Sequence, residues 1–421
     1  KANKYDIQIV SLPWGVTPMN ALEPDNPDHV EISNRIARQN ITRQPDIFIQ
    51  VSVPNEFNPV GKFNIGITAG VETTIVSPEF LQGCNKMNLI LTTSEFSKAA
   101  FVNTTYDQHD KNTKQKTGEL KLTTPMEVLF EGVDTNTYKK TDKIHDTVIN
   151  ELSGIKEDFC YLFVGHWLTG VTGSTLLNNL RGDLGQDRKD VGMMLKTFCE
   201  SFKRKSSKNR PGIILKSSHA TFSIIDRDVI IKKIQQIIEP YGDKAPNIYL
   251  LHGDLSDSEM NSLYNHPKVK SMVSFTKGEG YGRPLAEFGT TGKPIIASDF
   301  SGHKDFLKHA IMLPGQMTQV HASAADKFIL KEGQWFTVNY SYASKLLQDV
   351  MDNYKKYLEI SRKQPHHMKT NFSLTKMAEK FCECIDKNLN SVPQQTQLKL
   401  PKLKKIGDSP KLKLPKLKKV N

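Results

Sequence analysis

Two glutamates flank a short glycine-rich stretch, and their spacing suits two carboxylates that face one ligand. The stretch reads Glu279-Gly-Tyr-Gly-Arg-Pro-Leu-Ala-Glu287. Proline is favoured in the first turn of a helix, so we expect a helix that begins near Pro284 and ends at Gly292. The free N–H groups at its start would attract a phosphate, while the two carboxylates would accept hydrogen bonds from sugar hydroxyls. A nucleotide sugar would use both kinds of group.

A simpler interpretation of the same residues stays open. Arg283 and Glu287 are four positions apart, the spacing of an ordinary surface pair on a helix. Glycine loops also close many strand-to-helix turns for steric reasons alone.

The elements around this stretch place it where ligands bind in α/β proteins. Residues 271–275 are expected to form a buried strand before the loop, and residues 294–298 a second strand after the helix. Open parallel sheets bind ligands at the carboxyl ends of their strands. The loop is therefore expected at such an end.

The spacing of Glu279 and Glu287 resembles the Glu-x7-Glu element of retaining GT-B glycosyltransferases, especially the family 4-like (group 1) enzymes, some of which come from bacteriophages. Residues 92–98 resemble the strand-to-helix step of their first domain, and residues 131–134 its turn before the interdomain linker. The resemblance covers roughly residues 5–389. It implies two Rossmann-like domains and transfer of a sugar from a nucleotide donor, with retention and without a metal.

The resemblance also assigns cations to the donor's diphosphate. In the family, a strand that ends in Val-Gly-Arg and a later Arg-Lys-Gly supply these cations. Here Arg188 and Lys189 match the later pair, His166 stands at the position of the first arginine, and Lys216 ends the strand expected at residues 212–216. Histidine at that position departs from the family pattern and puts the activity in doubt.

Taken together, the expected site has a catalytic group and a donor-binding group. The catalytic residues are Glu279, Arg188 and Lys189. The residues expected to bind the donor, a UDP- or GDP-sugar, are Glu287, Gly280, Tyr281, Gly282, Arg283, Pro284, Lys216, His166 and Gly15. Glu72 and His109 are candidates for the acceptor side, although ordinary polar roles are favoured for both.

Strand-like and helix-like segments alternate along the chain, which predicts an α/β fold with two Rossmann-like, doubly wound domains and a basic C-terminal tail. Residues 5–12 are expected to form the first strand, which ends at the turn containing Gly15, and residues 30–39 a helix. Residues 107–118 are expected to form a polar loop. Asp226 is expected to cap a helix over residues 229–238, so Asp226-Arg-Asp228 is not interpreted as a metal site.

A chain of 421 residues is too long for one core, so two domains are expected. The polar stretch 136–155 marks the boundary between an N-terminal, acceptor-side domain (1–150) and a C-terminal, nucleotide-sugar-binding domain (151–365). By the resemblance, residues 366–390 form a helix that crosses back to the first domain. Residues 391–421 form the tail.

The formal charge of +12 is concentrated in that tail. From Gln397 onward it contains nine lysines and one aspartate, a charge of +8, which leaves about +4 for the rest. Leu-Lys-Leu-Pro-Lys-Leu-Lys-Lys occurs twice in it. DNA, an anionic membrane or an acidic protein would suit this repeat, with DNA preferred; a solubilising end is the plain alternative.

The composition suggests a cytoplasmic protein. Five scattered cysteines fit reduced thiols, no stretch is long and apolar enough to span a membrane, and the chain starts directly with an expected strand.

The sequence therefore favours a glycosyltransferase whose acceptor class includes modified DNA. Two alternatives stay open. One is a catalytically reduced GT-B scaffold that binds partners through its tail, and the other is a peripheral membrane enzyme that modifies a glycolipid.

Overall fold

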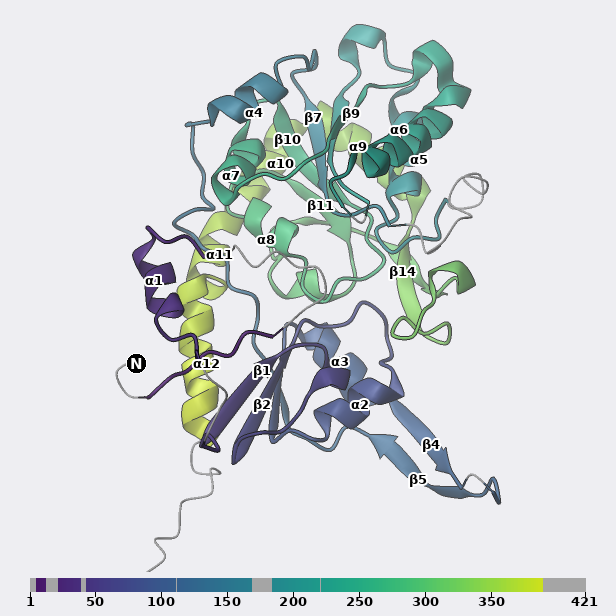
Figure 1. The fold of residues 1–421 in the computed structure, drawn as a ribbon. Coiled ribbons are helices and arrows are strands. Elements are labelled where there is room, and N and C mark those ends of the chain that lie inside the picture. The colour runs from purple at the N-terminus through teal and green to yellow at the C-terminus, as the bar shows by residue number, and fades with distance from the viewer. Residues whose placement is uncertain are drawn as a thin grey trace, which may run out of the picture.

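The structure is a computed structural model that describes residues 5–12, 22–38, 43–110, 112–168, 184–219 and 221–388. Two α/β units lie one above the other, each built on a parallel sheet (Figure 1). An α/β fold built on two parallel sheets is confirmed. Gly15 and the tail lie outside the described residues.

The second unit contains six parallel strands in the order β9-β8-β7-β10-β11-β12. Their bounds are β7 Cys160–Val164, β8 Gly212–Lys216, β9 Ile248–Leu251, β10 Val269–Ser274, β11 Ile295–Ser298 and β12 Ile311–Leu313. Counted within this sheet, the order is 3-2-1-4-5-6, the arrangement of dinucleotide-binding domains. The winding direction reverses between β7 and β10, and ligands bind at such a switch point.

Helices cover both faces of this sheet because its strands are apolar on both sides. Tyr161 and Phe163 of β7 pack in one cluster with Phe198 of α5, whereas Leu162 packs in another with Leu263 of α7. Strands buried on both faces are expected to be nearly continuous apolar runs, as these are. The helices of this unit are α4 Asp146–Glu151, α5 Val191–Phe202, α6 Ile224–Ile238, α7 Asp257–Asn265, α8 Arg283–Phe288, α9 Tyr340–Asp352 and α10 Tyr354–Ser361; the antiparallel pair β13 Gly315–Gln319 and β14 Gln334–Val338 lies beside them.

The first unit is smaller, with four parallel strands in sequential order. Its elements are α1 Pro27–Ser33, β1 Ile47–Val51, β2 Phe63–Thr68, α2 Pro78–Cys84, β3 Leu89–Thr92, α3 Glu95–Asn103 and β6 Met126–Val128. A hairpin of β4 (Thr105–His109) and β5 (Lys116–Lys121) projects from this unit (Figure 1).

The last described helices run from the second unit back to the first. After α11 (Gln364–Asn371), α12 (Leu374–Asn388) lies along the first unit, and its Cys384 packs in one cluster with Ile65 and Leu91. Lys387 at its end forms an ion pair of 2.6 Å with Glu127. No helix of the described chain is long and apolar enough to cross a bilayer.

The N-terminal expectations were partly wrong. Residues 5–12 do not join the sheet: their one bridge pairs Ile9 with Ile36, and Ile7, Val10 and Leu12 are 40–48% exposed. The apolar side chains of this segment therefore do not pack against a core, although they alternate as in a strand. The helix expected over residues 30–39 is shifted toward the N-terminus, as α1.

Three other local predictions also need correction. The stretch 107–118 contains most of the β4–β5 hairpin, because its polar side chains alternate on a solvent-facing ribbon. Helix α6 begins five residues earlier than expected and is capped by Ser223, whereas Asp226 accepts hydrogen bonds from Thr221. Helix α8 ends at Phe288, before Gly292.

Candidate functional site

The turn that carries Arg188 and Lys189 is held in place by buried charges. It precedes α5, whose N-cap residue Asp190 has a left-handed backbone (φ 54°). Such a backbone is unfavourable for a residue other than glycine and persists only where its surroundings hold it. The Asp190 carboxylate accepts hydrogen bonds from Lys277 (3.3 Å) and Tyr340 (2.7 Å), and the Lys277 amide donates to the Arg188 carbonyl (2.7 Å).

Glu279 is the acidic partner of both cations. Its carboxylate accepts hydrogen bonds from Lys189 Nζ at 2.5 Å and from Arg188 Nη1 at 3.2 Å. Burial alone would raise its pKa, but Lys189 and Arg188 lower the pKa of Glu279 to about 2. Glu279 is therefore an ionised, buried carboxylate with two cations on one side.

Glu72 brings a carboxylate from the first unit to the same place. Its Oε1 lies 3.8 Å from Arg188 Nη2, so Arg188 contacts carboxylates of both units. The sequence showed Glu72 as a polar residue after a strand and a candidate for the acceptor side, and this ion pair with a residue of the other unit could not be seen from the sequence.

His166 lies beside the same cations at the end of β7. Its Nδ1 is 2.9 Å from Ser218 Oγ, in the segment that follows β8. Burial, with the neighbouring charges of Lys189, Arg188 and Lys216, lowers the pKa of His166. The switch point thus gathers three cations around a histidine.

Lys216 ends β8, as expected, but it already has partners. Its Nζ donates to the carbonyl of Gly253 and lies 5.1 Å from the centre of the Phe222 ring. Burial lowers the pKa of Lys216.

The glycine loop is attached to the first unit. The Gly280 carbonyl accepts hydrogen bonds from the hydroxyls of Ser94 (2.6 Å) and Thr93 (3.1 Å), at the start of α3. A Cβ on Gly278 would lie 1.8 Å from the Glu72 carbonyl oxygen, so only glycine fits there. In the described part of the chain, the amides of Gly280, Tyr281 and Gly282 have no hydrogen-bond acceptor.

Helix α8 separates the two glutamates of the sequence motif. Gly282 caps it with a left-handed backbone (φ 100°), Arg283 and Pro284 form its first turn, and Tyr281 is buried against Phe306 with ring centres 4.8 Å apart. The Tyr281 side chain therefore packs in the core.

Glu287 lies on the buried side of α8. It accepts a hydrogen bond from Tyr264 Oη at 2.9 Å and lies 3.5 Å from Arg283 Nε. Burial raises the pKa of Glu287, and Arg283 opposes this shift. Among the described residues, Glu287 and Glu279 share no side-chain partner, so the simple picture of two carboxylates around one group is not seen.

Sequence reasoning missed the supporting charges. Lys277 and Asp190 form a buried ion pair, with side chains 1% and 0% exposed. Burial and the neighbouring Asp190 raise the pKa of Asp187 to about 7. The one signal in the sequence was the charged run Asp187-Arg-Lys-Asp190 directly before an apolar helix.

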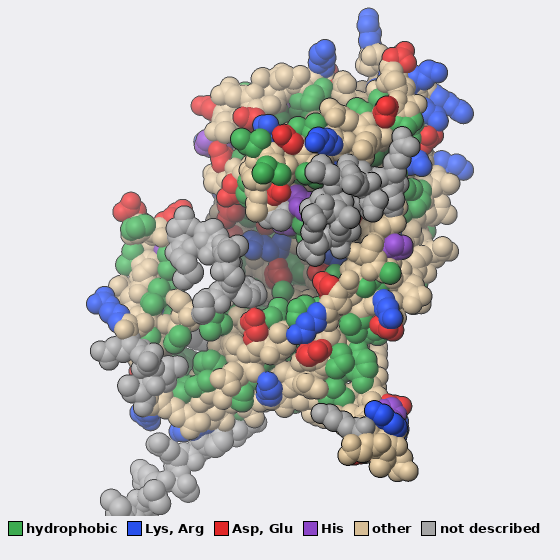
Figure 2. All heavy atoms as spheres, turned by 45° about the vertical axis from the view of Figure 1, so that its right-hand side comes forward, with side chains coloured by type: hydrophobic (Ala, Val, Ile, Leu, Met, Phe, Trp, Pro, Cys, Tyr) green, Lys and Arg blue, Asp and Glu red, His purple; other side chains and the backbone are tan. Residues whose placement is uncertain are grey.

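The site lies between the two units. Figure 2 shows a hollow between them, with acidic and basic side chains together at its floor. Within the described ranges, no group of three or more His, Cys, Asp or Glu side chains is arranged to hold a metal ion. Paired cations, a buried carboxylate and free amides suit a ligand that has both a phosphate and hydroxyl groups.

Comparisons with known proteins agree on the fold. No protein-family model matches the chain, and no curated protein is significantly similar in sequence. Among solved structures, sucrose-phosphate synthase of Thermosynechococcus elongatus matches with a TM-score of 0.54 at 10% identity, over 82% of this chain and 74% of that one. A glycosyltransferase of Rickettsia africae matches with a TM-score of 0.51 at 12% identity, over 77% and 70%.

A third similar structure is HepE of Anabaena in complex with UDP and glucose. Its TM-score is 0.50 at 14% identity, and the match covers 77% of this chain and 72% of that one. These neighbours are GT-B glycosyltransferases, and the present chain has their fold.

Proposed function

We propose that this protein is a retaining glycosyltransferase that takes its sugar from a nucleotide-sugar donor. One observation carries the proposal: Glu279, Arg188 and Lys189 converge at the switch point of the second sheet, on the side that faces the first unit. That is where nucleotides bind in this kind of sheet. The fold shared with glycosyltransferases, one of them in complex with UDP and glucose, supports the same conclusion.

Each part of the donor has a partner of suitable chemistry. Lys189 and Arg188 bind the diphosphate, with Lys216 and His166 beside them. Glu279 and the amides of residues 280–282 hold the donor sugar. Glu287 accepts the ribose hydroxyls, from a position further along α8. Separate surroundings for the two glutamates are compatible with these roles, because the sugar and the ribose are attached to opposite ends of the diphosphate.

The cations also explain how the reaction is accelerated. When the bond to the sugar breaks, negative charge grows on the departing diphosphate, and preorganised cations stabilise it. In the structure, Glu279 and Glu72 balance the charges of Arg188 and Lys189. A bound diphosphate takes over these contacts, so Lys189 exchanges a carboxylate for a phosphate. This division of work supports transfer of a UDP- or GDP-sugar without a metal.

For the acceptor, we propose modified DNA. The support is the charge of +12, of which +8 lies in the repeat tail. Phosphates would release counterions on binding lysine, which makes such binding strongly salt-dependent. Gel shifts with DNA, compared with flotation on anionic liposomes, separate this acceptor from a membrane glycolipid.

A second candidate is a scaffold with reduced activity. His166 favours it, because this residue is neutral where the family has an arginine, and because Glu279 and Glu72 already balance the two cations. Such a protein would bind nucleotide sugars weakly or not at all.

Donor hydrolysis without acceptor tests the proposal. We expect release of UDP or GDP from at least one sugar in a panel of nucleotide sugars, and a roughly 100-fold lower rate for Lys189→Met, the size of effect seen when one electrostatic stabiliser is removed. Lys355→Met, a change at an exposed lysine of α10, should keep the wild-type rate. Hydrolysis that survives in Lys189→Met would contradict the assignment, and the anomeric NMR signal of the first-formed product tests retention.

A further inference from the structure

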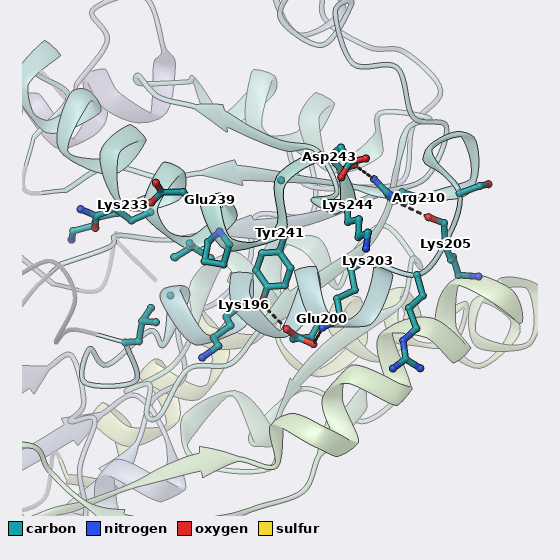
Figure 3. A pocket seen from close by; sticks show the side chains of 18 of the residues that line it. Lys196, Glu200, Lys203, Lys205, Arg210, Lys233, Glu239, Tyr241, Asp243 and Lys244 are labelled. Atoms are coloured by element: carbon teal, nitrogen blue, oxygen red, sulfur yellow. Dashed lines mark hydrogen bonds and ion pairs between the residues drawn. The ribbon is translucent and has the colours of Figure 1, made fainter.

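A large basic groove lies on the second unit, and none of the residues that line it was assigned to the candidate site. Its volume is about 1560 Å³, and α5, α6 and the segment after α6 form its walls. Seven lysines and arginines line it, against three acidic residues. Figure 3 shows Lys196, Glu200 and Lys203 on one side of α5, with Tyr241 lying close to them.

The acidic residues do not neutralise this groove. Glu200 is already paired with Lys203 at 2.6 Å and accepts a hydrogen bond from Tyr241 Oη at 2.9 Å. In contrast, no carboxylate of the described chain lies within ion-pair distance of Lys196, Arg204 or Lys244. Three cations therefore remain available to an anionic partner.

The groove runs beside α5, which has twelve residues and is therefore about 18 Å long at a rise of 1.5 Å per residue. The axes of packed helices lie roughly 8–10 Å apart, so the valley between them is narrow. An extended single strand can lie along such a valley with its phosphates against the lysines and arginines, and the experiment separates it from a membrane surface or a duplex.

The groove also contains an aromatic ring, Tyr241, on which a base could stack. Tyr241 is partly exposed, and Lys203 Nζ lies 5.8 Å from its ring centre. Proteins that bind single-stranded nucleic acids without sequence preference combine a positive groove along the backbone with aromatic rings that stack on bases. This groove contains both parts.

The groove also starts next to the candidate site. Gly192, which lines it, is in the first turn of α5, three residues after Lys189. A strand held along α5 would thus lead toward the hollow between the units.

We propose that this groove binds a single-stranded nucleic acid through its phosphates, with one base stacked on Tyr241. The inference deepens the proposed function and rests on it for the idea that the bound strand belongs to the acceptor. Binding itself requires no donor.

The test measures fluorescence anisotropy of a labelled twelve-nucleotide oligo-dT, without nucleotide sugar. The protein is the full chain with its nine tail lysines replaced by glutamine, so that the tail does not dominate binding. The variant combines Lys196→Glu, Arg204→Glu and Lys244→Glu, and the matched control combines Lys140→Glu, Lys355→Glu and Lys369→Glu, which lie outside the groove.

We expect the groove variant to bind at least tenfold more weakly. The slope of log affinity against log salt should decrease in size by about 2, because each lost phosphate contact on a single strand contributes about 0.7. The control should remain within twofold of its parent. If the groove variant does not fold, as judged by circular dichroism, Tyr241→Leu takes its place, with an expected loss of roughly tenfold.

Three results would overturn the proposal: equal binding by the groove variant and its parent, tighter binding of a duplex than of the single strand, or groove-dependent binding of phosphatidylserine vesicles but not of the oligonucleotide. Donor hydrolysis, measured on the wild-type chain, separates the two proposals. Hydrolysis without groove-dependent binding removes this inference alone, and groove-dependent binding without hydrolysis removes the enzymatic proposal alone.

Discussion

Glu279 connects most of the charges in the candidate site. It contacts Lys189 and Arg188 directly, and through Arg188 it is linked to Glu72 of the other unit. A single bound diphosphate would therefore change the partners of four side chains. Residues of this kind respond to a ligand together, so the variants that test them need controls that leave the network intact.

His166 should make donor binding depend on pH. Burial and three neighbouring cations lower its pKa from 6.5, so the imidazole is neutral at pH 7. A bound diphosphate favours the protonated form, hence binding takes up a proton and affinity should increase as the pH falls below 6.5. Titration calorimetry with UDP-glucose over about two pH units, from roughly pH 5.5 to 7.5, would measure this increase.

Two variants isolate the histidine. His166→Gln should lose that part of the pH dependence. His166→Arg should bind the donor about tenfold more tightly, the value of one charge-assisted hydrogen bond, at every pH. An unchanged pH profile in His166→Gln would show that the imidazole does not meet the diphosphate.

Glu287 can be tested with almost no change of shape. Glu287→Gln removes the charge but can still accept the hydrogen bond from Tyr264. If Glu287 accepts the ribose hydroxyls, donor affinity should fall about tenfold while the fold remains stable. Tyr264→Phe is the control: it should lower the free energy of unfolding by about 1 kcal/mol and leave donor affinity nearly unchanged. If Glu287→Gln binds the donor as tightly as the wild type does, the Glu287 carboxylate only helps α8 to pack and does not contact the ribose.

At the level of single residues, sequence patterns revealed groups that are close together along the chain. Arg188 and Lys189 stood out because they resemble the Arg-Lys pair of the glycosyltransferase family, and Glu279 because it begins a glycine loop with the family's Glu-x7-Glu spacing. Lys277 and Asp190 did not stand out, and Glu72 was only a candidate for the acceptor side, since each meets its partner from another element. Such contacts depend on how loops of two units pack, which local patterns do not contain.

The elements of the site are joined at the glycine loop. Residues 277–282 contact the turn before α5 through Lys277 and the start of α3 through Gly280. Gly278 is the tightest point, because its missing Cβ leaves room for the Glu72 carbonyl.

Gly278→Ala should therefore damage both stability and activity. The added methyl group forces the loop or the Glu72 backbone to move, and overpacking of this kind costs about 1–3 kcal/mol of unfolding free energy. The midpoint temperature of thermal unfolding and the rate of donor hydrolysis should both decrease. Gly154→Ala is the matched control, since no atom lies within 4 Å of a Cβ at that position. If both variants behave like wild type, the contact between the units does not support the site.

Local signals predicted elements well where the partners were near in sequence. Ser256 and Glu259 have the three-residue spacing of a capping box and form one at the start of α7, and Ser94 caps α3. The prediction of a strand over residues 5–12 was wrong. Alternation of apolar and polar residues shows that a segment can form a strand, but not that it pairs with the edge of a sheet. The β4–β5 hairpin was predicted as a loop for a related reason: its strands are so polar that their sequence cannot be distinguished from that of a loop.

At the level of the whole molecule, two parallel sheets enclose one hollow, and the charge is unevenly distributed around it. The switch point between β7 and β10 faces this hollow, the basic groove runs along α5, and the nine-lysine tail follows α12. The alternation of strands and helices predicted two sheets. The strand order, which locates the site, became visible only in the structure.

The central claim is that a nucleotide sugar binds through its diphosphate to Lys189 and Arg188, beside Glu279. Isothermal titration calorimetry of UDP- and GDP-sugars with the wild-type protein, Lys189→Met and the control Lys355→Met tests it most directly. The account predicts saturable binding of at least one donor, a loss of affinity of roughly tenfold or more in Lys189→Met, and no change in Lys355→Met. Equal affinity in all three proteins, or no binding of any nucleotide sugar to the wild type, would contradict it.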